Sequence, residues 1–86
     1  MEKKQKHLNV VVETIEGESV ALEVNIENKV SHLMEKAMKE LSIDINTAST
    51  YEMLYNGTLM NPDSKIEVYN IPENGIVLLQ RRPKVG

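Results

Sequence analysis

The chain has 86 residues, enough for one small domain with a single core but too few for a catalytic cleft between domains. It contains no cysteine, which excludes disulfides, a thiol nucleophile and thiolate metal ligands, and makes the reducing cytoplasm the expected location. Residues 8–79 hold twelve Asp and Glu against four Lys, and such an acidic body with only three tyrosines as aromatic residues argues against nucleic-acid binding. No apolar run has the length of a membrane span, so we expect no membrane association.

Two alternating segments follow a short N-terminal tail. Residues 1–7 are rich in lysine and predict a flexible basic tail. Apolar and polar residues then alternate from Leu8 to Glu13 and again from Val20 to Ile26, which is the period of half-buried strands. Gly17 between them can adopt the positive φ of a hairpin bulge. The two segments therefore predict a β-hairpin.

The hydrophobic period changes after Asn28. Apolar side chains recur at spacings of three and four from Val30 to Leu41, with charged residues on the other face, which predicts an amphipathic helix. We expect Asn28 to cap this helix, because its side chain can accept hydrogen bonds from the unpaired amides of the first turn. A helix over residues 28–41 is long enough to cover a small sheet.

Four further elements complete the predicted domain. After a polar loop at residues 44–50, we expect a strand at residues 51–55 and a short return strand at residues 59–60. A turn of helix at residues 65–69 and a final strand at residues 76–79 follow. The last of these is a short apolar run with the β-branched content of a buried strand. The predicted core consists of the apolar residues Val10, Val12, Val20, Leu22, Val24, Val30, Leu33, Ala37, Leu41, Met53, Tyr55, Ile66, Ile71, Val77 and Leu79.

The residues after the final strand predict a solvated arm. Two arginines, a proline and a lysine cannot continue the buried strand, so we place the domain at residues 8–80 and a flexible tail at residues 81–86. A terminal glycine on such an arm can thread a narrow channel and present its carboxylate to an activating enzyme, as a protein-conjugation tag must. The alternative is an ordinary flexible chain end without a function.

The order of elements is that of a β-grasp, and several segments resemble the ubiquitin family. Residues 19–24 resemble the second strand of ubiquitin, and the segment from Gly57 aligns without a gap so that Gly86 falls on the terminal glycine of ubiquitin. The turn at residues 56–62 and the Val-Gly ending also look like the ubiquitin-fold modifier. The resemblance covers residues 8–86 and implies an α+β fold, a mixed twisted sheet with one helix packed across it.

The resemblance also implies a function for the arm. In the family, an activating enzyme uses ATP to adenylate the glycine carboxylate, here Gly86, and passes it as a thioester to a conjugating enzyme, which joins it to an amine of a target protein. A deconjugating protease reverses the reaction, the modifier is a monomer, and it needs no cofactor of its own. Arg81, Arg82 and Lys84 would guide the arm into an acidic groove of the activating enzyme. Val85 replaces the penultimate glycine of ubiquitin, which implies an activating enzyme of different specificity.

The hydrophobic recognition patch of ubiquitin maps onto Ile15, Leu54, Leu78 and the polar Gln80. The first three are therefore expected to form a partner-binding patch, since buried apolar area contributes roughly 25 cal/mol per Å². The alternative is that they are scattered surface apolar residues, which are common.

The sequence has no recognisable arrangement of catalytic residues, so we expect the protein to be a substrate of enzymes and not an enzyme. His7 and His32 have no second histidine or cysteine at ligand spacing, and no metal site is predicted. Two alternatives to a covalent modifier stay open. One is a non-covalent adaptor, like the ubiquitin-like components of bacterial secretion systems, and the other is a sulfur carrier, against which Val85 counts because those proteins end in Gly-Gly.

Overall fold

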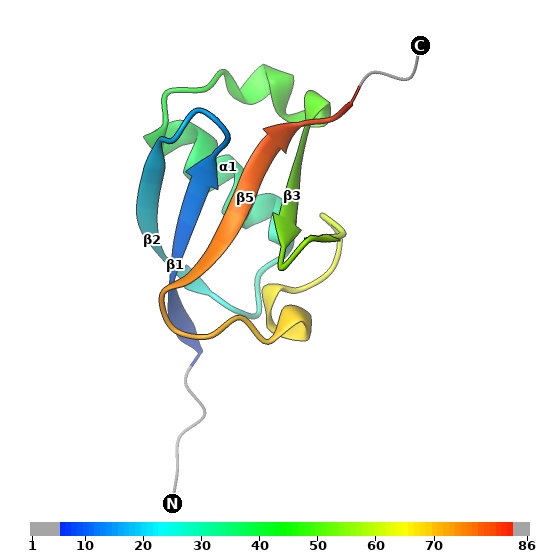
Figure 1. Cartoon of the computed structure of the whole chain (residues 1–86). Coiled ribbons are helices and arrows are strands. Elements are labelled where there is room, and N and C mark those ends of the chain that lie inside the picture. Colours follow the sequence, from blue (N-terminus) through cyan, green and yellow to red (C-terminus); the bar gives the residue numbers. More distant parts are fainter. Residues whose placement is uncertain (1–5, 84–86) are drawn as a thin grey trace, which may run out of the picture.

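The computed structural model describes residues 6–83, which form a five-stranded mixed sheet with one α-helix on one face (Figure 1). The elements in chain order are β1 His7–Thr14, β2 Ser19–Asn25, α1 Val30–Glu40, η1 Ile45–Thr50, β3 Tyr51–Tyr55, β4 Thr58–Leu59, η2 Ile66–Tyr69 and β5 Gly75–Arg81. The strand order is β2-β1-β5-β3-β4, with β1 and β5 parallel and the other pairs antiparallel. The sequence-based expectation of a mixed sheet with a single helix is confirmed.

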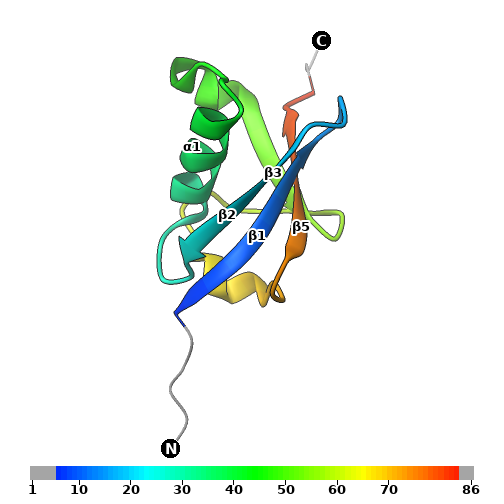
Figure 2. The same ribbon diagram turned by 90° about the vertical axis from the view of Figure 1, so that its left-hand side faces the viewer.

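The core lies between α1 and one face of the sheet, as the view along the sheet shows (Figure 2). Twelve of the fifteen predicted core residues are buried. The other three, Val20, Leu41 and Tyr55, are half-buried because they lie at the ends of β2, α1 and β3 and pack against the rim of the core. Three methionines complete the core in addition to those predicted, since a long unbranched side chain fills the space between helix and sheet; they are Met34, Met38 and Met60.

The start of α1 differs from the prediction. The N-cap is Lys29, which makes no side-chain capping bond, so the proposed Asn28 cap is wrong. The amides of Val30 and Ser31 instead donate to the carbonyls of Ser64 and Pro62, at 2.8 and 3.0 Å. Carbonyl groups from a distant loop therefore satisfy the helix terminus, and local sequence could not reveal them.

The predicted domain, residues 8–80, is too short at both ends. At the first end, His7 pairs with Asn25 in the sheet and the Lys6 carbonyl accepts from the amide of Ile26 at 2.8 Å. At the other end β5 continues through Arg81, which lies opposite Tyr51. A charged side chain does not prevent its backbone from pairing when it can remain in solvent at the end of a strand. Lys6, His7, Arg81, Arg82 and Pro83 of the two predicted tails are described, whereas residues 1–5 and 84–86 lie outside the described residues.

The turn before β5 is fastened to β1 through one carboxylate. Glu73 accepts from the backbone amide of Asn9 at 3.1 Å and from the Asn9 side-chain amide at 2.7 Å. The amide of Asn74 donates to the Asn9 carbonyl at 2.7 Å. The two hydrogen bonds from Asn9 lower the pKa of Glu73 because they stabilise the ionised carboxylate. The bond from the backbone amide has the larger effect, and the bond from the side-chain amide the smaller.

Glu73→Gln should therefore destabilise the fold in a pH-dependent way. The folded-state pKa of Glu73 lies below its unfolded value, so its contribution is fully present above the unfolded pKa and is lost as the pH falls through the folded pKa. The difference in melting temperature between the wild type and Glu73→Gln should shrink on acidification. Glu40→Gln, at the exposed end of α1, controls for the loss of one surface carboxylate. A Glu73→Gln difference that is the same at neutral and acid pH would contradict the assignment.

Candidate functional site

The end of β5 is fixed against β3 by both arginines that the sequence predicted as steering charges. The guanidinium of Arg81 lies 5.7 Å from the centroid of the Tyr51 ring, within the range of a cation–π contact. The amide of Arg82 donates to the carbonyl of Thr50 at 2.8 Å, and its Nε donates to the carbonyl of Tyr51 at 3.2 Å. Arg81 and Arg82 are nevertheless exposed, so their charges face solvent while their contacts set the direction of the chain.

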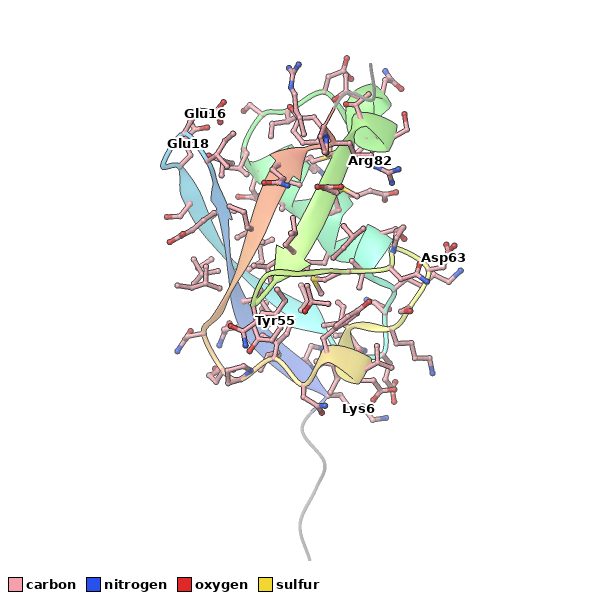
Figure 3. The ribbon with its side chains drawn as sticks, turned by 45° about the vertical axis from the view of Figure 1, so that its right-hand side comes forward. Lys6, Glu16, Glu18, Tyr55, Asp63 and Arg82 are labelled. Carbon is pink, nitrogen blue, oxygen red and sulfur yellow. The ribbon has the colours of Figure 1, made fainter. Side chains whose placement is uncertain are left out.

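Pro83 is the last described residue, and it follows these anchored arginines directly. Figure 3 shows Arg82 at the same end of the molecule as Glu16 and Glu18 of the β1–β2 hairpin, with Lys6 at the opposite end. The described chain therefore enters the fold at one end and leaves it at the other. Lys84, Val85 and Gly86, the remaining residues of the predicted arm, lie outside the described residues.

Leu54 and Leu78 lie together on the face of the sheet opposite α1. They are directly opposed in the β3–β5 register. Their neighbours Met53 and Leu79 are buried against the helix, so the alternation of a strand turns Leu54 and Leu78 outward, where both are half-buried. The structure thus brings together two of the three predicted patch residues.

Ile15, the third predicted patch residue, lies at one end of this face. It follows β1 directly and is 70 % exposed. It lines the same surface pocket as Gln80, whose side-chain amide donates to the carboxylate of Glu52 at 2.7 Å. The polar pair of Gln80 and Glu52 occupies the next row of the sheet after Leu78 and Leu54. Ile15 is therefore near the patch but at its margin.

Four further apolar residues, which were not predicted from the sequence, extend the patch. Val11 lies between Ala21 of β2 and Ile76 of β5 in the register, and Leu59 of β4 lies opposite Leu54. We call the resulting set the apolar stripe; it consists of Ala21, Val11, Ile76, Leu78, Leu54 and Leu59. Ile76 is 53 % and Leu59 58 % exposed. One signal could have identified Ile76: a single helix covers only one face of a sheet, so half of the apolar run at residues 76–79 has to face outward.

The remaining titratable residues do not form a reactive cluster in residues 6–83. No three His, Asp or Glu side chains of this part of the chain are close enough to hold a metal ion. His7 and His32 are exposed. The Tyr69 hydroxyl accepts from the Asn61 amide at 2.7 Å, which is a structural role. Across the same residues, no helix has the length and apolar character that a membrane crossing requires.

Comparisons with known proteins agree with this architecture. The model of the family described as ubiquitin-2 like Rad60 SUMO-like matches residues 8–78. Among solved structures, a protein designed de novo on the basis of ubiquitin superposes with a TM-score of 0.82. That superposition covers 95 % of this chain and 96 % of the designed protein at 23 % sequence identity, which shows a shared fold. A search of curated proteins gave no match.

Proposed function

The chain belongs to the ubiquitin-like, SUMO-like family, and from this premise we propose that it is a covalent protein modifier. An activating enzyme joins the carboxylate of Gly86 to the AMP part of ATP and releases pyrophosphate. An enzyme cysteine then displaces AMP to form a thioester, which is passed to a conjugating enzyme. An amine of the target protein displaces that thiolate and forms an amide bond. ATP is a substrate of the activating enzyme, and the modifier itself supplies only its carboxylate.

The observation that carries the proposal is the way β5 leaves the fold. β5 pairs with β1 on one side and with β3 on the other, so it is held in the middle of the sheet. The contacts of Arg82 with Thr50 and Tyr51 extend this support to the last residue before Pro83. A carboxylate three residues beyond Pro83 would therefore be presented from a rigid base, which lowers the entropy cost of placing it in a channel.

The other predicted residues have roles that follow from this proposal. The exposed charges of Arg81 and Arg82, together with Lys84, would speed association with an acidic groove on the activating enzyme. Val85 would select an enzyme whose channel accepts a branched side chain before the glycine. Deconjugation by a protease, a monomeric state and a cytoplasmic location belong to the same proposal.

The apolar stripe favours a second candidate function, a non-covalent adaptor. An exposed apolar surface on a sheet face is the expected feature of a module that binds other proteins. Such an adaptor would need the stripe but would have no use for Gly86. The two functions are therefore separated by the requirement for that one residue.

Covalent adducts in cells test the modifier proposal. A chain tagged at its N-terminus and expressed in its source cells should give a ladder of larger species that survives boiling in detergent and thiol. Removal of Gly86 should eliminate the ladder while leaving the circular dichroism spectrum unchanged. A ladder that persists without Gly86 would contradict conjugation through that residue, and no ladder with the intact chain would favour the adaptor.

A further inference from the structure

The apolar stripe crosses the whole sheet on the side that α1 leaves open, the side turned toward the viewer in Figure 1. Each of the five strands contributes at least one residue to it: Ala21 from β2, Val11 from β1, Ile76 and Leu78 from β5, Leu54 from β3 and Leu59 from β4. Because five strands are separated by four inter-strand spacings, the stripe forms a track about 19 Å long across the sheet. The stripe is therefore long and narrow, unlike the compact patch of three residues that the sequence predicts.

The charged side chains at the outward-facing strand positions beside this stripe are all negative. Glu13 is opposite Leu78 in the register, Glu23 lies two residues beyond Ala21, and Glu52 lies two residues before Leu54. The outward positions of the five strands include no lysine or arginine. Glu16 and Glu18 of the hairpin add further acidic groups at the end where β1 meets β2 (Figure 3).

We propose that the apolar stripe binds an amphipathic helix of a partner protein whose apolar face is flanked by lysine and arginine. The inference deepens the recognition surface of the proposed function by naming the chemistry of its partner. It does not require that Gly86 be conjugated, so the two can fail separately.

The dimensions of the stripe fit a helix. One helical turn rises 5.4 Å, close to the spacing of neighbouring strands, so each turn of a helix lying across the sheet can place an apolar side chain above one strand. About 13 helical residues span the track of about 19 Å. An added strand would instead need unpaired backbone groups, whereas this face presents side chains.

The charges decide against a second copy of this chain as the occupant. Pairing two stripes face to face would bring Glu13, Glu23 and Glu52 of one copy against the same acidic residues of the other. Like charges placed opposite each other oppose association, while a basic rim on the partner attracts and orients it. The acidic rim equally disfavours an anionic membrane surface.

Peptide binding to the chain lacking Gly86 tests the inference independently of conjugation. The probe is a synthetic helix of about 14 residues with a leucine stripe flanked by lysine and arginine. A second peptide has the same composition in scrambled order, and a third has glutamate in place of the basic residues. We expect the first to bind at least about tenfold more tightly than either of the others, because only the first satisfies both apolar and charge complementarity.

Matched variants locate the binding site. Leu54→Ser with Ile76→Ser should abolish the preference for the first peptide, whereas Val68→Ser, which alters an exposed apolar residue outside the stripe, should preserve it. Glu13→Gln with Glu23→Gln should weaken binding and reduce its salt dependence. Glu35→Gln with Glu40→Gln removes the same charge from α1, in the other layer of the fold, and should leave binding unchanged.

Three results would overturn the inference. Equal affinity for the basic and acidic peptides would show that the rim charges do not select the partner. Equal weakening by the two pairs of Glu→Gln variants would show attraction to the net charge of the protein, without a defined surface. A dimer in sedimentation that dissociates in the Leu54→Ser, Ile76→Ser variant would identify a second copy as the occupant.

Discussion

Leu79→Ala should lower the free energy of unfolding by about 2–5 kcal/mol, the range for deleting most of a fully buried leucine side chain. Leu79 is 1 % exposed and lies in β5, the central strand, directly opposite Met53 in the register. Leu33→Ala on α1 should have an effect of the same size, because Leu33 is also fully buried in the core between helix and sheet. Two-state denaturant unfolding measures both.

Ile76→Ala is the matched control for Leu79→Ala. It shortens an aliphatic side chain on the same strand, but on the face away from α1, where Ile76 is 53 % exposed. Its loss should stay below about 1 kcal/mol. Since a small domain has a total stability of only about 5–15 kcal/mol, the two variants should differ clearly in denaturation midpoint. Losses below about 1 kcal/mol for both Leu33→Ala and Leu79→Ala would contradict the core assignment.

Periodicity in the sequence was sufficient to predict the order of the elements and most of the core. Alternation located β1 and β2, and spacings of three and four located α1, because each pattern records which side of its own element is buried. Asn28 shows the limit of this reasoning. Its role as a cap was assigned from neighbouring residues, whereas the helix terminus is satisfied by carbonyl groups more than thirty residues away, at Pro62 and Ser64.

The candidate site was predicted in part. Leu54 and Leu78 were placed on one surface through the family resemblance, and the register confirms that they are neighbours. Val11, Ala21 and Leu59 could not be added from the sequence, because they join the same surface only through the lateral order of the strands. Lateral order is set by long-range pairing, of which a single sequence carries no direct record.

The end of β5 was mispredicted for a related reason. Arg81 and Arg82 look like the start of a solvated arm when they are considered as charged residues alone. In the fold, Tyr51 offers Arg81 an aromatic face and Arg82 a carbonyl, and these groups come from a strand about thirty residues earlier. The arginines are thus part of the support from which the proposed conjugation terminus extends.

Deletion of Gly86 should abolish loading of the chain onto its activating enzyme while leaving the fold intact. Adenylation and thioester transfer require a carboxylate that reaches the enzyme's active site, and deletion of Gly86 both shortens the arm and ends it on the branched Val85. Val85→Gly should be tolerated, because it removes bulk and adds only conformational entropy to the arm. Removal of residues 1–5 is the matched truncation control and should not affect loading.

The most direct measurement is a loading assay with purified activating enzyme, ATP and either the intact chain or the chain lacking Gly86. The intact chain should form an adduct with the enzyme that depends on ATP and is released by thiol, and the shortened chain should form none. Equal loading of both chains, or no adduct of the intact chain with an enzyme that otherwise supports its conjugation in cells, would contradict the assignment of Gly86 as the conjugation terminus.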